Sequence, residues 1–191
     1  MKQATLKLTA LVMLLGGSIT IAEAQTTANP INVVTTAVPF LRISPDARSG
    51  GMGDVGIATS ADANSGFWNL AKTPFATSKT SIAASYTPWL NDLKLNDVYL
   101  ASLAGYYQLD ELQAVSASLR YFSLGSIQFT DFNGAPLQSF RPREFAIDAG
   151  YSRKLSSKVA LGVALRYISS DLAGGSVNGV TYKKGSSVAG D

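Results

Sequence analysis

The 191-residue sequence contains no cysteine and no histidine. Without cysteine the chain has no disulfide, no thiolate zinc site and no thiol nucleophile, and it cannot carry a lipid on an N-terminal cysteine. Without histidine it lacks the commonest general base and the commonest metal ligand, so most hydrolase mechanisms lose a member. We therefore predict a protein that is not an enzyme, with no catalytic residue, no metal site and no cofactor.

The N-terminus has the three parts of a secretory signal peptide. Two lysines within the first seven residues precede an apolar run over residues 8–21, and Ala22-Glu23-Ala24 follows. The run is shorter than the roughly 20 residues of a permanent membrane span, and its small exit residues suit a signal peptidase. We predict a signal peptide over residues 1–24, cleaved between Ala24 and Gln25, and hence an exported protein.

Charge and long apolar runs are both scarce. Charged residues make up 15% of the chain, against about 25% in soluble domains. No apolar run after residue 24 is long enough for a spanning helix, and the net charge of +3 indicates no nucleic acid or other polyanion as a partner. Export with this composition favours a membrane β-barrel, with a secreted β-sandwich as the alternative.

Residues 25–78 differ from the rest of the chain. The stretch up to residue 40 is rich in threonine and asparagine and contains two prolines, which suits an extended lead-in. Ser44 is predicted to cap a helix with Pro45 at its first position, and Gly50-Gly51 should end that helix within two turns. A second short helix is expected near Asp62. We predict that this region forms a small plug inside a larger structure.

From residue 79 onward the apolar residues recur with a period of two, which is typical of β-strands. Five strands are predicted, at roughly residues 79–88, 97–108, 112–123, 142–154 and 158–170. Each has one apolar face and one small or polar face. The polar face carries the candidate lumen-facing residues Arg120, Asp148 and Arg166.

Three features favour a membrane barrel over a sandwich. The strands span about 10 to 13 residues, enough to cross a bilayer at a tilt, and aromatic residues lie near their ends. The connections also alternate in length, as in outer-membrane barrels with short periplasmic turns and long external loops. The short connections are Leu109–Glu111 and Leu155–Ser157, and the long ones are Pro88–Asn96, Leu124–Arg141 and Asp171–Val180.

The long connection over Leu124–Arg141 is the candidate partner-binding loop. Its Asn133-Gly134 dipeptide predicts a hairpin tip. Apolar groups in one external loop indicate either a partner or a lid that folds back. The candidate partner-binding residues are Phe129, Phe132, Asn133, Leu137 and Phe140.

Two motifs are interpreted as structural. Residues 51–56 match the G-x-G-x-x-G pattern, but no strand precedes them and no helical period follows, so we interpret them as tight turns rather than as a dinucleotide site. Asp46, Asp54 and Asp62 recur every eight residues with nothing nearby to complete an acid/base or metal site. They are interpreted as helix caps or turn residues.

Residues 47–59 with 62–65 and 68–72 resemble the N-terminal signature of the PorV family of the type IX secretion system. They resemble, more loosely, the FadL-like barrels that carry hydrophobic compounds. One departure is Leu70, where the wider family commonly has proline. The resemblance implies an all-β fold, the N-terminal part of a FadL-like transmembrane antiparallel β-barrel, with a small N-terminal plug carrying short helices and residues 79–191 forming the barrel strands.

The resemblance also implies a function in the outer membrane. Proteins of this family bind cargo through its C-terminal signal domain and carry it from the translocon SprA to an attachment complex that contains PorU, PorQ and PorZ. A transporter of hydrophobic small molecules is the alternative, and a secreted adhesin domain is a third.

The number of strands leads to one further expectation. After the plug only five strands can be counted, with a sixth beginning at Val180, and Val188–Asp191 resembles the start of another family strand. Bacterial single-chain barrels need at least about eight strands. We therefore expect the 191 residues to be the N-terminal part of a longer protein, unable to close a barrel alone.

Overall fold

The computed structural model of the chain describes residues 38–90, 92, 95, 97–172, 175–177 and 180–191. The chain divides into two units, Met1–Thr35 and Thr36–Asp191, and all described residues belong to the second. The predicted signal peptide, its cleavage site at Ala24 and Gln25, and the lead-in as far as residue 37 lie outside the described residues.

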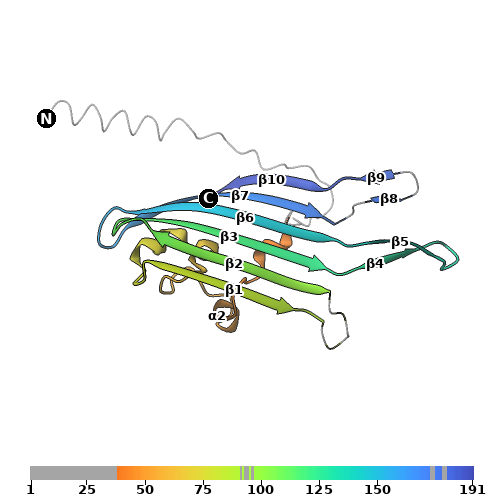
Figure 1. The fold of residues 1–191 in the computed structure, drawn as a ribbon, viewed down its shortest axis with the longest axis horizontal. Coiled ribbons are helices and arrows are strands. Elements are labelled where there is room, and N and C mark those ends of the chain that lie inside the picture. The colour runs from red at the N-terminus through yellow and green to blue at the C-terminus, as the bar shows by residue number, and fades with distance from the viewer. Residues whose placement is uncertain (1–37, 91, 93–94, 96, 173–174, 178–179) are drawn as a thin grey trace, which may run out of the picture. The chain divides into compact units, whose positions relative to one another are not determined.

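The second unit is built on an antiparallel sheet of long strands in the order β1-β2-β3-β6-β7-β10 (Figure 1). The strands are β1 (Thr80–Pro88), β2 (Val98–Gln108), β3 (Gln113–Leu124), β6 (Arg143–Lys154), β7 (Ala160–Asp171) and β10 (Gly185–Gly190). Within the described residues the sheet is not closed, and β1 and β10 are its edges. The fold is all-β and barrel-like, as predicted.

Two small hairpins extend the sheet at one end of its strands (Figure 1). Strands β4 (Ile127–Thr130) and β5 (Pro136–Phe140) form the first, and β8 (Gly175–Val177) and β9 (Val180–Tyr182) form the second. The short connections after β2 and β6 lie at the opposite end. Long and short connections therefore alternate between the two ends of the sheet.

The predicted strands agree closely with the structure, with one exception. Each of the five predicted strands begins within two residues of the position at which a strand of the observed sheet begins. The prediction of a sixth strand from Val180 is wrong, because residues 180–182 form β9 and pair with β8, while the sixth strand of the sheet starts at Gly185. The Val-Thr-Tyr pattern favours a strand locally but carries no information about which strand it pairs with.

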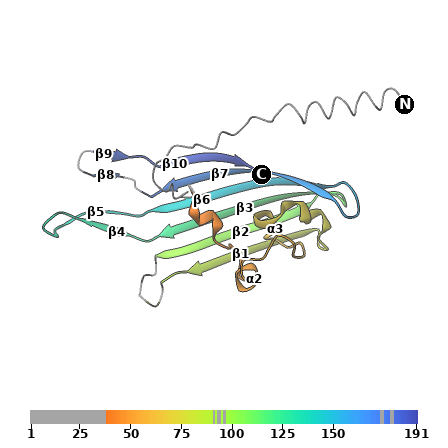
Figure 2. The ribbon, with the colours of Figure 1, turned by 180° about the vertical axis from the view of Figure 1, so that it is seen from behind.

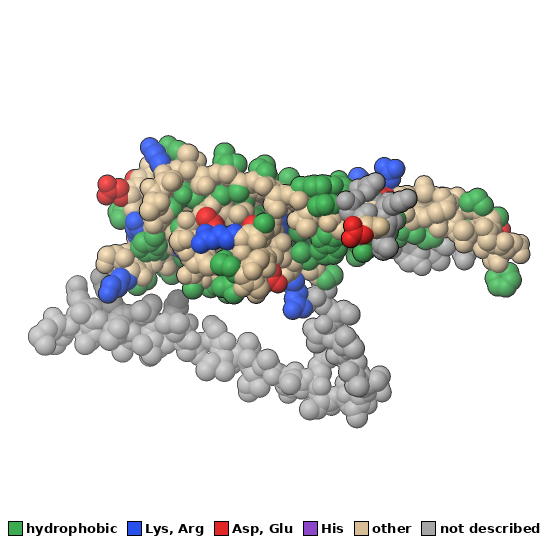
Figure 3. All heavy atoms as spheres, turned by 90° about the horizontal axis from the view of Figure 1, so that it is seen from below, with side chains coloured by type: hydrophobic (Ala, Val, Ile, Leu, Met, Phe, Trp, Pro, Cys, Tyr) green, Lys and Arg blue, Asp and Glu red, His purple; other side chains and the backbone are tan. Residues whose placement is uncertain are grey.

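The two faces of the sheet differ sharply in chemistry. Along β7 the burial alternates residue by residue, so that Leu161, Val163 and Leu165 are exposed on one face. The cross-strand register continues this apolar outer face, for example through the row of Leu103, Leu119 and Ile147. Figure 3 shows such hydrophobic side chains standing out along one side of the sheet. The other, inner face carries the buried polar and small residues.

A segment of short helices, residues 39–75, covers the inner face (Figure 2). It consists of η1 (Pro39–Arg42), α2 (Ala47–Gly51), α3 (Ser65–Trp68) and η2 (Leu70–Phe75). We call it the helical segment. None of the helices in the described residues has the length and hydropathy needed to cross a membrane.

The two α-helices begin slightly later than predicted, and Asp46 is a helix cap, as interpreted from the sequence. The cap of α2 is Asp46 rather than Ser44, because the Asp46 carboxylate accepts a hydrogen bond of 2.8 Å from the Ser49 backbone N–H. A carboxylate is favoured there over a hydroxyl since it also interacts with the helix dipole. The second helix starts at Ser65 after Asn64, slightly later than the predicted start near Asp62.

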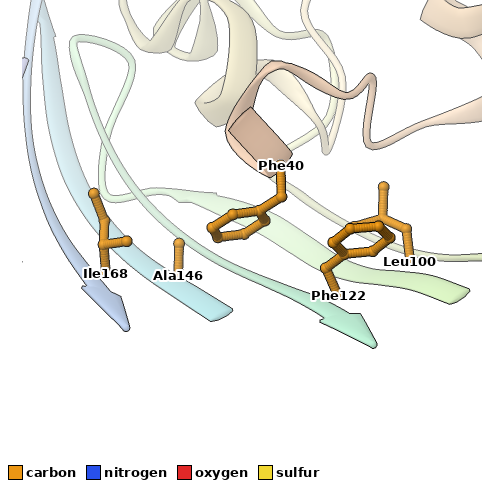
Figure 4. Close-up of a cluster of buried hydrophobic side chains, with 5 residues drawn as sticks. All are labelled: Phe40, Leu100, Phe122, Ala146 and Ile168. Atoms are coloured by element: carbon orange, nitrogen blue, oxygen red, sulfur yellow. The ribbon is translucent and has the colours of Figure 1, made fainter. Parts of the chain in front are cut away.

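The helical segment is held to the sheet by a small apolar core. Phe40 of η1 projects toward the strands, where it meets side chains of the inner face (Figure 4). The buried cluster is Phe40, Leu100, Phe122, Ala146 and Ile168. Near Leu70 the helical segment approaches the sheet closely because Gly150 has no side chain. A Cβ at that position would lie 2.5 Å from Cδ2 of Leu70.

Candidate functional site

The inner face of the sheet brings the predicted lumen residues Asp148 and Arg166 together. They lie opposite each other on β6 and β7, and Arg166 Nε donates a hydrogen bond to Asp148 Oδ1. The Ser118 hydroxyl on β3 donates to the second carboxylate oxygen, Oδ2, at 3.0 Å. Arg166 also makes a 3.4 Å ion pair with Asp191. The buried charge of Asp148 is thus compensated from both neighbouring strands.

Arg120, the third predicted residue, interacts with the helical segment instead. It is almost fully buried, and its Nη1 donates a 2.7 Å hydrogen bond to the backbone carbonyl of Leu41. Its guanidinium carbon lies 4.5 Å from the centre of the Phe67 ring, a cation–π geometry. Its Nε has no hydrogen-bond partner within the described part of the chain. Arg120 therefore ties the helical segment to the sheet.

Residues that resemble the family signature are linked by hydrogen bonds to one another and to the preceding Asp46 within the helical segment. The Trp68 indole N–H donates to the Asp46 carboxylate at 3.0 Å, and Arg48 makes a 3.1 Å ion pair with Asp62. Lys72 Nζ donates to the Gly56 carbonyl at 2.5 Å. Sequence motifs alone did not reveal these contacts, because the partners lie 14 to 22 residues apart. Trp68 itself was the available signal, since an indole N–H that is partly removed from water needs an acceptor.

The position of Lys72 also affects its electrostatics. The pKa of Lys72 lies below its ordinary value, because partial burial disfavours the charged amine more strongly than the nearby Asp62 carboxylate favours it. Lys72 donates a second hydrogen bond of 3.0 Å to the Thr59 hydroxyl. All of its observed contacts stay within the helical segment, so its role in the structure is to hold the turn around Gly56.

A hollow of about 390 Å³ lies between the helical segment and the inner face. Its charged wall is formed by Arg120, Arg166 and Asp191, and apolar groups such as Phe67 and Leu70 line the rest. Within the described residues no group of three or more acidic, histidine or cysteine side chains has a geometry that could hold a metal ion. The hollow is therefore a mixed polar and apolar space beside a neutralised ion-pair network.

The candidate partner-binding loop forms the β4–β5 hairpin. The Asp131 carboxylate accepts hydrogen bonds from the backbone N–H groups of Asn133 and Ala135 at 2.9 and 2.8 Å, and Gly134 has a positive φ of 80°. The predicted Asn-Gly tip is therefore present. Phe132, Asn133 and Leu137 are exposed, whereas Phe129 and Phe140 are half-buried.

The hairpin is separated from the polar cluster of the inner face. Figure 1 places β4 and β5 beyond one end of the sheet, and Figure 3 shows hydrophobic side chains at that end. The structure thus divides the predicted residues into two groups. Arg120, Asp148 and Arg166 lie on the inner face, and the apolar loop residues lie on a projecting hairpin.

An antiparallel sheet with an apolar outer face, a polar and charged inner face, and connections of alternating length is the architecture of outer-membrane β-barrel proteins. The all-β, barrel-like fold of the chain shares these features with that class. Residues 25–190 match the family model described as "Type IX secretion system protein PorV". The chain belongs to the PorV family and is a component of the type IX secretion system. None of the curated proteins compared with the chain matches it.

Membership in this family has direct consequences for localisation and activity. It places the protein in the outer membrane, in association with the type IX secretion system. The family is a secretion-system family rather than an enzyme family. The resemblance noted in the sequence is thereby confirmed for almost the whole chain after residue 24.

Proposed function

We propose that this protein binds exported cargo through its C-terminal signal domain and carries it from the translocon SprA to the attachment complex of PorU, PorQ and PorZ. These partners are the ones that resemblance to the PorV family implies. In this proposal the signal peptide over residues 1–24 directs export and is removed between Ala24 and Gln25. Residues 25–78 act as the plug, and the strands after residue 79 insert into the membrane with their apolar face toward lipid.

The observation that carries the proposal is the projecting β4–β5 hairpin. Phe132 is fully exposed at its tip, and Ile127 and Leu137 are about half exposed on its arms. Apolar groups gathered on a hairpin outside the lipid-facing surface are typical of a protein-binding site. The alternating connections support an orientation with this hairpin outside the cell and the short turns in the periplasm.

The packing of the inner face supports a shuttle over a transporter of hydrophobic small molecules. Transport would need an open apolar path past the helical segment. Phe40 and Leu70 instead pack directly against the strands, and the adjacent hollow has a charged wall. A shuttle needs docking surface on its loops, and the hairpin supplies it.

The test is a pair of substitutions on the hairpin, Phe132→Ser with Leu137→Ser. Both side chains are exposed, so the free energy of folding should change by no more than about 0.5 kcal/mol each. We expect the amount of cargo attached at the cell surface to fall about tenfold or more. The readout is cargo in the surface fraction relative to the amount of the variant in the outer membrane.

A matched control uses the same chemical change at the other end of the sheet. Leu109→Ser with Leu155→Ser alters two exposed leucines in the short connections and should leave cargo delivery unchanged. Normal delivery by the hairpin variant would overturn the docking role and favour a folded-back lid or the transporter alternative.

The orientation can be tested separately because the chain has no cysteine of its own. Phe132→Cys should react with a membrane-impermeant maleimide on intact cells, whereas Leu155→Cys should react only after the outer membrane is permeabilised. The opposite pattern would show that the hairpin faces the periplasm.

A further inference from the structure

The outer face of the sheet contains an apolar groove that the proposed cargo function does not use. It has a volume of about 720 Å³ and lies over β1, β2 and β3, with one side chain from β6. None of its lining residues is charged. The residues of the outer face that line it include Ile82, Leu103, Gly105, Tyr107, Val115 and Ala117.

The groove exists because small residues face each other across two strands. Gly105 on β2 is paired with Ala117 on β3, and larger side chains stand on either side of this pair. On one side Leu103 is paired with Leu119, and on the other Tyr107 is paired with Val115. Side chains of one face of a sheet stand in such cross-strand rows, so a small pair between two large pairs leaves a furrow.

The small residue at position 105 is required by the backbone as well. A Cβ there would lie 2.9 Å from the Ser81 carbonyl oxygen of the neighbouring strand. Ala117 has no such restriction, and its side chain is exposed on the outer face. The floor of the groove can therefore be filled from Ala117 without disturbing the strand pairing.

A positive charge stands at one end of the groove. Lys79 Nζ lies 5.5 Å from the centre of the Tyr107 ring, and Tyr107 lines the groove. The backbone carbonyl of Lys79 accepts a 2.8 Å hydrogen bond from Gln108, the last residue of β2, so Lys79 lies level with the short connection that follows. An amine and a tyrosine at the end of a membrane strand occupy the depth of the lipid headgroups.

We propose that this groove is a binding site for one phospholipid, with an acyl chain along the Gly105–Ala117 furrow and the phosphate on Lys79. The inference rests on the membrane insertion of the sheet proposed above. The uncharged furrow matches a hydrocarbon chain, and the amine at its end matches a phosphate, for which lysine acts as a point charge. The orientation proposed above places this lipid in the periplasmic leaflet.

The site is tested by native mass spectrometry of the full protein extracted from outer membranes and titrated with dioleoyl phosphatidylglycerol. We expect one lipid adduct that saturates before any further binding. Ala117→Leu fills the furrow and should weaken this first binding event about tenfold. Ala149→Leu is the matched control, since Ala149 is paired with Ala117 on the next strand and is exposed, but does not line the groove.

The charge is tested in the same titration. Lys79→Gln should weaken the first binding event several-fold, whereas Lys158→Gln, at the other short connection, should leave it unchanged. Dioleoylglycerol, which lacks the phosphate, should bind the unmodified protein as weakly as phosphatidylglycerol binds Lys79→Gln.

The possible outcomes separate the site from its premise. Equal binding by Ala117→Leu and Ala149→Leu would mean that the lipid is part of an unspecific annulus or that another membrane protein covers the groove, and either result overturns the proposal. Equal binding of the two lipids would overturn the role of Lys79. Membrane insertion is measured independently, by resistance of the same variants to carbonate extraction, so its failure is distinguishable from failure of the groove.

Discussion

Removal of one partner of the Asp148–Arg166 ion pair should destabilise the protein strongly, whereas removal of both partners should cost much less. The two side chains are only 8% and 17% exposed. Removing one partner of a buried pair costs about 3 to 5 kcal/mol, because the other charge is left buried without compensation. In Asp148→Leu, Arg166 keeps its contact with Asp191, which is largely exposed and worth about 1 kcal/mol at most. We therefore expect a loss of about 3 kcal/mol in the free energy of unfolding.

The double variant separates the value of the pair from the cost of an orphaned charge. Asp148→Leu with Arg166→Leu removes both charges from the inner face, and apolar replacement of a buried pair is often close to neutral. The Ser118 hydroxyl lacks its acceptor in this variant as it does in Asp148→Leu, and that loss of about 1 kcal/mol is the main cost that remains. The double variant should thus be more stable than Asp148→Leu alone, by about 2 kcal/mol.

The assay is a urea titration of the protein in detergent, followed by tryptophan fluorescence. Trp68 lies in the helical segment and Trp89 packs edge-on against Phe122, so the two indoles report on both layers. A double variant that loses as much as the two single variants together would refute the reasoning, because it would show that the two charges act independently.

Two further substitutions test the outer face and the helical segment. Val163→Arg places a charge on the exposed apolar face of β7 and should lower the stability of the protein in the membrane by about 2 to 4 kcal/mol. The control Val159→Arg, just before the strand, should cost about 1 kcal/mol at most. Equal assembly of both variants in the outer membrane would contradict the face assignment. Gly56→Ala should destabilise the helical segment, since its Cβ would lie 2.2 Å from a ring carbon of Trp68, whereas Gly51→Ala meets nothing within 4 Å and should be neutral. Limited proteolysis checks this pair, and equal cleavage rates would show that the indole moves aside.

The local features of the fold could be predicted from the sequence to a large extent. The period of two located the strands and predicted one apolar face for each, and Leu161, Val163 and Leu165 lie on that face of β7. This inference is local because successive side chains of a strand point to opposite sides whatever the strand pairs with. The Asn-Gly dipeptide located the hairpin tip for a similarly local reason, since Gly134 adopts a positive φ that glycine accepts freely. Neither inference needed a distant residue.

Predictions that depended on partners were less successful. Val180 was predicted to begin a strand of the main sheet, although it begins β9 of the β8–β9 hairpin, and Ser44 was predicted to cap the helix that Asp46 caps. The period of two places Arg120, Asp148 and Arg166 on one face of the sheet, but it does not indicate that Asp148 pairs with Arg166 while Arg120 contacts Leu41. Composition identifies which residues face inward, but the order and register of the strands decide which of them meet.

The sequence by itself determined the class of the protein, because strand period, scarce charge and the family signature are properties of local stretches of chain. The tertiary structure alone decided the contacts between distant residues, such as Trp68 with Asp46 and Arg120 with Leu41. It also decided the groove beside Ala117, which needs two strands in one particular register. The physical reason is that hydrogen bonds and packing between distant residues depend on three-dimensional geometry within tenths of an ångström, and a period along the chain does not encode it.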